Sequence, residues 1–159
     1  MTEKSTIGLA GEYYVLAQLA HRGFVGALTL SNTKAVDILV SQTGLRSLCR
    51  LEVKTTQKPP GRERLFGPKP FFRWPMSVKH QSIRAANLFY CFVWIESPER
   101  RPRFFIVPSA HVAKYVRDQH RKYEKARGRK VRTLMRMFRI AEHDPERFED
   151  DWNVLVRHE

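Results

Sequence analysis

Two stretches, Val36-Asp-Ile-Leu-Val-Ser41 and Ser47-Leu-Cys-Arg-Leu-Glu-Val-Lys54, decide the fold class of this chain. In each of them apolar residues alternate with polar or charged ones, which is the pattern of a strand with one buried face. Gly44, in a loop from Gln42 to Leu45, predicts that a tight turn joins the two strands into a hairpin.

The two apolar sets also predict a register for the hairpin. Pairing Ile38 with Cys49 brings the apolar residues of both strands onto one face. On the other face Asp37 then lies opposite Arg50 and diagonal to Glu52. Diagonal neighbours are roughly 7–8 Å apart, a gap that one metal ion bridges through carboxylate ligands.

The polar face of this hairpin carries the groups that metal-dependent cleavage of a phosphodiester requires. Asp37 and Glu52 are predicted to hold Mg²⁺, with Mn²⁺ as a substitute, and the Val53 carbonyl supplies a further oxygen. Lys54 lies on the same side of its strand as Glu52, where it orients the attacking water or neutralises charge on phosphate. The alternative is a solvated sheet face with a surface Asp and a Glu/Lys pair.

The first segment predicts a helix that begins at Ser5 or Thr6, runs to about His21 and is ended by Gly23. Its apolar stripe is expected at a set of small and large apolar positions, with Leu19 at one margin. These positions are Leu9, Tyr13, Leu16, Ala17 and Ala20.

Glu12 falls within or beside that stripe. Either it reaches water from the margin of the stripe or, if the helix crosses the sheet near Asp37, it adds a third acid to the site. Gly8 and Gly11 would permit close backbone approach at this end of the helix.

In their order and spacing these motifs resemble the PD-(D/E)XK nuclease superfamily. The resemblance rests on Gly11-Glu12, on Asp37 at the start of a strand, and on Glu52-Val53-Lys54 about fifteen residues later. It covers about residues 7 to 57 and is closest to small single-domain bacterial members, which include intron-encoded homing endonucleases and, more distantly, junction resolvases. Val36 stands where the motif's name has proline. The resemblance implies an α/β fold with an αβββαβ restriction-endonuclease-like core, a mixed central sheet flanked by helices.

The same resemblance assigns roles residue by residue. Asp37 and Glu52 become metal ligands, Lys54 the catalytic lysine and Glu12 the first-helix acid. Gln57 matches a polar residue that some branches place after the motif. The implied activity is Mg²⁺-dependent cleavage of DNA.

Composition points to the same substrate. The chain has 159 residues and a net charge of +13, and 42% of its residues are hydrophobic, which fits one domain, residues 1–159, that binds a polyanion. No apolar run is long enough to span a membrane, and the start lacks a signal peptide. Cys49 and Cys91 both fall in apolar strand patterns and are expected to be reduced. A cytoplasmic protein that does not bind membranes is the expectation.

Two basic segments are expected to bind the nucleic acid. They are a loop at 58–77 and an arm at about 117–139. Five prolines and two glycines between Lys58 and Pro75 predict irregular structure for the loop. Its aromatic residues either contact nucleic acid or cover a small second core. The residues expected to bind phosphate are Arg62, Arg64, Lys69, Arg73, Lys79, Arg121, Lys122, Arg127, Arg129, Lys130 and Arg132.

The remaining elements follow from local patterns. They are a short helix or turn at 78–86, a strand at 88–95 that is buried on both faces, a strand at 104–107, and a helix that starts at Pro108-Ser109. A closing helix is expected from Asp144-Pro145. His80, His111 and His120 are interpreted as surface or phosphate-contact residues because none has zinc-ligand spacing.

The sequence therefore predicts a Mg²⁺-dependent DNA endonuclease. One alternative is a non-catalytic or structure-selective nucleic-acid-binding protein on the same fold, and a weaker one is a basic subunit of a ribonucleoprotein. Cutting both strands of a duplex would call for a homodimer or a higher homo-oligomer, because one small domain presents one site. The sequence does not specify the target.

Overall fold

The computed structural model describes residues 2–29, 36–42 and 48–157. Its two long helices are α1 (Thr2–His21) and α2 (Ser109–Arg127). The strands are β1 (Phe24–Leu28), β2 (Ile38–Gln42), β3 (Cys49–Thr56), β4 (Phe71–Ser77), β5 (Leu88–Trp94), β6 (Arg103–Pro108) and β7 (Met135–Ala141). Three short 3₁₀ helices complete the list: η1 (Arg64–Phe66), η2 (Val78–Gln81) and η3 (Trp152–Leu155).

The strands form a five-stranded mixed sheet in the order β1-β2-β3-β5-β6 and a two-stranded ribbon of β4 and β7. Among the strands that the structure describes, only the central β3–β5 pair is parallel, and the other neighbours in both sheets are antiparallel. The predicted α/β class with a mixed central sheet is therefore confirmed. The αβββαβ order is not reproduced, because η1, β4 and η2 connect β3 to β5 where that core has a helix, and α2 follows β6.

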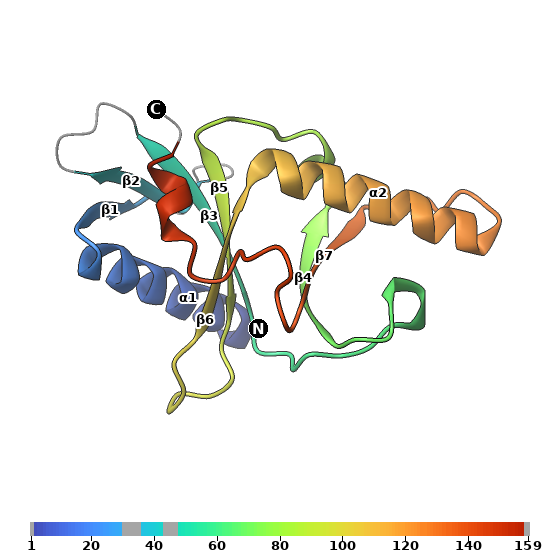
Figure 1. The fold of residues 1–159 in the computed structure, drawn as a ribbon, viewed down its shortest axis with the longest axis horizontal. Coiled ribbons are helices and arrows are strands. Elements are labelled where there is room, and N and C mark those ends of the chain that lie inside the picture. Colours follow the sequence, from blue (N-terminus) through green and yellow to red (C-terminus); the bar gives the residue numbers. More distant parts are fainter. Residues whose placement is uncertain (1, 30–35, 43–47, 158–159) are drawn as a thin grey trace.

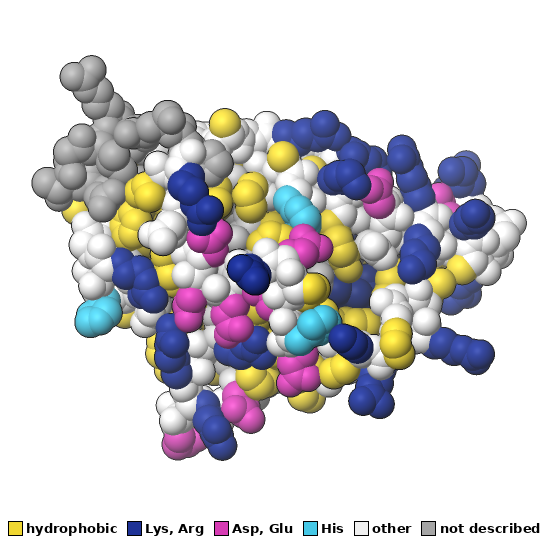
Figure 2. All heavy atoms as spheres, in the orientation of Figure 1, with side chains coloured by type: hydrophobic (Ala, Val, Ile, Leu, Met, Phe, Trp, Pro, Cys, Tyr) yellow, Lys and Arg dark blue, Asp and Glu magenta, His cyan; other side chains and the backbone are white. Residues whose placement is uncertain are grey.

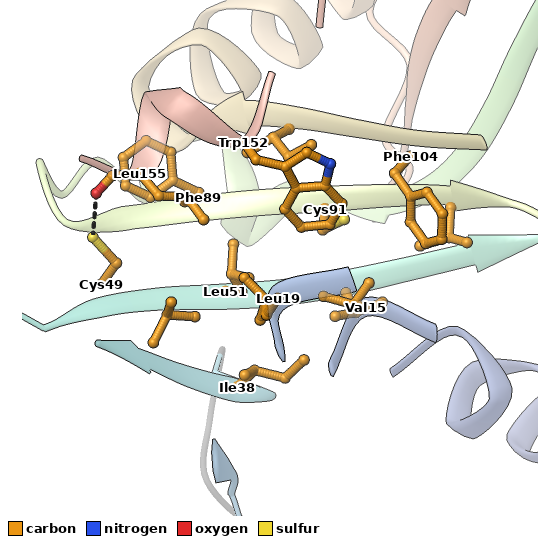
Figure 3. Close-up of a cluster of buried hydrophobic side chains, with 14 of the residues drawn as sticks. Val15, Leu19, Ile38, Cys49, Leu51, Phe89, Cys91, Phe104, Trp152 and Leu155 are labelled. Atoms are coloured by element: carbon orange, nitrogen blue, oxygen red, sulfur yellow. Dashed lines mark hydrogen bonds between the residues drawn. The ribbon is translucent and has the colours of Figure 1, made fainter. Parts of the chain in front are cut away.

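Each face of the five-stranded sheet has its own core. On one face α1 and the C-terminal η3 cover β2, β3 and β5, with Val15, Leu19, Trp152 and Leu155 fully enclosed (Figures 1 and 3). On the other face α2 and the β4–β7 ribbon cover β5 and β6. The buried aromatic residues Phe72, Trp74, Phe92, Phe105 and Phe138 dominate this second core.

Two aromatic residues of the basic loop, Phe72 and Trp74, belong to this second core. Phe72 and Trp74 are 0% exposed, and the Trp74 indole N–H donates to the Val93 carbonyl at 3.0 Å. The expectation of irregular structure from Lys58 to Pro75 holds for residues 58–70, apart from the single turn of η1, and is wrong from Phe71 on, where β4 starts. Pro75 is tolerated since β4 pairs with one strand only, so an edge position needs no N–H donor.

Several other expectations about the later chain need correction. The basic arm expected at about 117–139 consists largely of regular elements: α2 continues to Arg127, Gly128 ends it in a left-handed conformation, and β7 begins at Met135. No long helix starts at Asp144; turns lead to the one-turn η3. Trp152 and Leu155 are buried, each with 3% of its surface exposed.

Locally encoded elements agree with the predictions. β5 is buried along nearly its whole length, β6 covers the expected 104–107 strand, and α2 begins directly after Pro108. The turn at 78–86 contains η2. Cys49 and Cys91 are buried and free, as expected.

Helix α1 ends where predicted, with Gly23 at φ +80°, but it begins earlier, at Thr2, and its buried face differs. Leu9 and Tyr13 are exposed, and the buried side chains are Val15 and Leu19. The face is rotated because Gly11 packs directly on β3: a Cβ at this position would overlap the Thr55 hydroxyl. Gly8, by contrast, has nothing within 4 Å of a built Cβ.

This contact makes a matched pair of substitutions informative. We expect Gly11→Ala to lower the free energy of unfolding by about 1–3 kcal/mol, because the added methyl forces α1 away from β3. Gly8→Ala should be neutral or slightly stabilising, since alanine favours helix more than glycine. Denaturant unfolding of both variants checks this. Equal effects at the two positions would show that α1 does not sit tightly on β3, whereas partial rescue of Gly11→Ala by Thr55→Ala would confirm the contact.

Candidate active site at the start of β2 and the middle of β3

The hairpin register differs from the predicted one by two residues. Ile38 lies opposite Leu51, and Leu39, rather than Asp37, lies opposite Arg50. Continuing this register by one residue places Asp37 level with Glu52, directly across the strand pair instead of diagonal to it. A shift of two keeps every side chain on its own face, so the site survives the change. The predicted turn at 42–45 lies largely outside the described residues.

Asp37 is fastened to β3 by its own backbone and side chain. Its N–H donates to the Leu51 carbonyl at 2.8 Å, and the Val53 N–H donates to its Oδ2 at 2.6 Å. The Asp37 carboxylate, one residue before β2, thereby serves as the hydrogen-bond acceptor that a backbone carbonyl would supply if the strand pairing continued. This fixes Asp37 beside the middle of β3, at the position that carries Glu52.

Glu52 is the most enclosed acid of the group, with 4% of its surface exposed. Its Oε1 receives two donors, Lys54 Nζ at 2.6 Å and His80 Nε2 at 3.3 Å. Burial acts to raise the pKa of Glu52, but His80 and Lys54 outweigh it and bring the value to about 2. The second oxygen, Oε2, is buried without a hydrogen-bond partner among the described residues.

His80 is a site residue that sequence reasoning missed. It is 3% exposed, so its interpretation as a surface or phosphate-contact residue is wrong. The Ser77 N–H donates to its Nδ1 at 3.0 Å, and its Nε2 faces Glu52 Oε1 at 3.3 Å. The Ser-x-x-His spacing of a capping box marks the start of η2 in the sequence. The contact with Glu52 is long-range and leaves no local signal.

Tyr90 completes the wall of the site on the neighbouring strand β5, where it pairs with Glu52. Burial and the nearby Glu52 carboxylate raise the pKa of Tyr90 well above its usual range, so its hydroxyl stays protonated. That hydroxyl makes no hydrogen bond of normal geometry within the described residues, but it lies close enough to the Glu52 carboxylate to interact with it.

Glu12 on α1 and Asp37 are the two acids of the site whose negative charge is least offset by neighbouring groups. Burial raises the pKa of Glu12, and the Asp37 charge raises it further. Burial also raises the pKa of Asp37, against the Val53 N–H and Lys54, while Glu52 adds to the rise. Raised pKa values on two adjacent acids indicate negative charge that the surrounding side chains do not neutralise.

These residues fit a hard cation that keeps most of its water. Across residues 2–29, 36–42 and 48–157, no three His, Cys, Asp or Glu side chains come together closely enough to enclose a metal ion. Mg²⁺ needs no such enclosure, because one or two carboxylates and several waters suffice. Such an ion would give the Oε2 of Glu52 a partner. It would also stabilise the charged form of Asp37, whose pKa is raised by burial.

The remaining predicted site residue is not brought into this group. Gln57 is exposed as the first residue after β3, and no contact within the described part of the chain joins its side chain to the acids. Lys54 is half-buried, with 29% of its side chain exposed. Val53 lies between Glu52 and Lys54 with its side chain in the α1-covered core.

The predicted phosphate-binding residues are nearly all on the surface. Figure 2 shows Lys and Arg side chains gathered over the half of the molecule that contains the end of α2. Arg73 is the exception, because it is half-buried and pairs with Glu63 at 3.0 Å. The exposed ones are Arg62, Arg64, Lys69, Lys79, Arg121, Lys122, Arg127, Arg129, Lys130 and Arg132.

Comparisons of the chain with family models, with curated proteins and with solved structures find no match. The described part of the chain contains no helix long and apolar enough to cross a membrane. A functional proposal for this chain therefore rests on the geometry of the site and on the surface charge.

The buried ion pair predicts a specific pH dependence. Because the pKa of Glu52 falls from its usual 4.5 to about 2 on folding, its charge stabilises the fold above pH 4.5. That contribution, about 3 kcal/mol, is lost as the pH falls from 4.5 toward 2. The raised pKa values of Asp37 and Glu12 act in the opposite direction, so the wild-type curve alone does not isolate Glu52.

A comparison with Glu52→Gln isolates it. In chelator, the difference in unfolding free energy between wild type and Glu52→Gln should shrink between pH 4.5 and about pH 2. The exposed Glu96, which pairs with Arg100 at 3.7 Å, supplies the control Glu96→Gln, for which no such change is expected. A Glu52→Gln difference that stays constant over this range would mean that Glu52 is not held as a buried carboxylate.

Proposed function

We propose that this protein is a Mg²⁺-dependent endonuclease that hydrolyses phosphodiester bonds in DNA. The observation that carries the proposal is the convergence of Asp37, Glu52 and Lys54, on a chain with a net charge of +13. A protein that only bound nucleic acid would gain nothing from acids that repel phosphate. The PD-(D/E)XK resemblance is consistent with this reading and belongs to the same proposal.

In this proposal Asp37, Glu52 through its Oε2, and the Val53 carbonyl would hold the cation. When bound, Mg²⁺ would polarise the phosphate and lower the pKa of an attacking water. Lys54 orients that water or neutralises the charge that develops on phosphate. His80 keeps the Glu52 carboxylate oriented through its Oε1, which leaves Oε2 available.

A second candidate function follows from the Lys54–Glu52 distance of 2.6 Å. This ion pair satisfies one Glu52 oxygen without any metal, as it would in a nucleic-acid-binding protein that does not cut. Such a protein would use the exposed basic residues alone, and its affinity would fall steeply with salt.

One substrate panel separates the two candidates. Labelled duplex DNA, a four-way junction, single-stranded DNA and RNA are each incubated with Mg²⁺, with Mn²⁺ and with chelator. The nuclease proposal predicts DNA products with either metal and none in chelator. Salt-sensitive binding without products under any condition would favour the binding protein. Cleavage of both strands of the duplex in one encounter would support a homodimer or a higher homo-oligomer.

A further inference from the structure

Three apolar side chains remain exposed where β4 and β7 meet η2. Leu134 is 77% exposed, Met135 is 61% exposed and Val78 is 37% exposed. Their backbones lie side by side, because Ser77 pairs with Met135 and the Val78 N–H donates to the Leu134 carbonyl at 2.8 Å. We refer to Val78, Leu134 and Met135 as the apolar tip. Clustered apolar side chains of this kind gain free energy when a partner covers them.

The apolar tip stands on a rigid base. Arg136 is 8% exposed, and its guanidinium donates to the carbonyls of Thr133 and Met135 at 2.8 Å each. The same guanidinium also donates to the Gln81 side chain in η2. The turn that carries Leu134 is thereby tied to η2, so presenting the tip to a partner costs little ordering entropy.

The tip lies next to the candidate active site. Val78 and His80 belong to the same turn of η2, and His80 Nε2 is 3.3 Å from Glu52 Oε1. A molecule whose phosphate reached Glu52 and Lys54 would therefore pass beside Val78 and the two residues packed with it.

The charge around the tip selects among possible partners. Lys79 is exposed within η2, and Arg129, Lys130 and Arg132 are exposed in the segment that leads into Leu134. The nearest acid to this segment, Glu124, accepts from Lys130 at 3.3 Å and from the Val131 N–H at 3.0 Å, which leaves the arginines for a ligand. Exposed apolar side chains surrounded by basic ones are complementary to DNA, which has anionic phosphates outside and apolar stacked bases inside. They are less complementary to an apolar protein surface.

We infer that the apolar tip inserts between base pairs of the DNA duplex beside the scissile phosphate, while its basic rim contacts the flanking backbone. Leu and Met are among the residues that proteins insert as wedges into base steps, and the resulting kink opens the duplex toward the protein. This inference rests on the proposed function, since it names how the same substrate is held.

The salt dependence of binding separates the apolar tip from its basic rim. For Leu134→Ala/Met135→Ala we expect the affinity for a mixed-sequence duplex to fall on the order of tenfold, with an unchanged slope of log affinity against log salt. Lys79→Ala should reduce that slope by about one, because it removes a phosphate contact. Val25→Ala, at a 60% exposed apolar residue of β1, serves as the control and should bind like wild type. Wild-type affinity of the double variant would overturn the inference.

A tryptophan reporter tests insertion directly. With chelator present, Leu134→Trp fluorescence should be quenched when the duplex binds, because an inserted indole stacks on bases, whereas Val25→Trp fluorescence should not change. Unchanged Leu134→Trp emission while anisotropy reports bound DNA would overturn the inference. Neither readout needs cleavage, so quenching in a protein that never cuts would sustain the wedge and refute the nuclease. Cleavage without quenching would do the reverse.

Discussion

Asp37→Asn is expected to lower Mg²⁺-dependent cleavage of DNA about a thousandfold, while leaving salt-sensitive DNA binding intact. The loss corresponds to the several kcal/mol that a bound cation supplies to a phosphoryl transition state. Asparagine keeps an oxygen to accept the Val53 N–H, which donates to Asp37 at 2.6 Å, so the fold of the hairpin is preserved. Single-turnover cleavage with excess protein measures the effect.

The same variant should be more stable than wild type in chelator at neutral pH. The pKa of Asp37 is raised in the folded state, so its stability contribution is greatest at low pH and is lost as the pH rises through that pKa. Asparagine removes this cost and also relieves the neighbouring Glu12. Asp118→Asn, at an acid of α2 that pairs with Lys114 at 2.9 Å, is the control and should lose stability slightly. If Asp37→Asn cleaved DNA at the wild-type rate, Asp37 would not be a residue of the active site.

Lys54→Met carries the second largest expected effect. We expect cleavage to fall by about 10²–10³, because the ammonium no longer neutralises charge at the phosphate. Divalent cation binding should be retained or strengthened, since the variant removes a positive charge that lies 2.6 Å from Glu52 Oε1 and repels the cation. Methionine keeps most of the aliphatic length of the half-buried lysine.

The control for this variant lies close by. Lys58 is exposed just beyond β3, and Lys58→Met should leave cleavage near the wild-type rate. Rapid-quench kinetics and a separate cation titration distinguish the two roles of Lys54. If Lys54→Met lost cation binding together with cleavage, the lysine would be supporting the fold of the site rather than acting on phosphate.

The parts of the fold that local periodicity specifies could be predicted. β5 is a continuous apolar run, α2 begins after a proline, and both appear at the expected positions. β4 and β7 were concealed by Pro75 and by the many basic residues around them. In β4, however, Phe72, Trp74 and Met76 alternate with other residues in the period-two pattern of a strand.

The grouping of Asp37, Glu52 and Lys54 was also predictable, because face alternation constrains it. The register itself was not, since a shift of two residues preserves both faces and the loop length decides between them. The buried face of α1 depends on the contact of Gly11 with Thr55, and the role of His80 depends on η2 folding back over β3. Both are long-range packing effects that a local pattern does not encode.

Titration of the protein with Mn²⁺, following the free ion by electron paramagnetic resonance, tests the central claim most directly. We expect one site in the wild type that is lost in Asp37→Asn and in Glu52→Gln but kept in Lys54→Met. Equal Mn²⁺ binding by wild type and Asp37→Asn would contradict it.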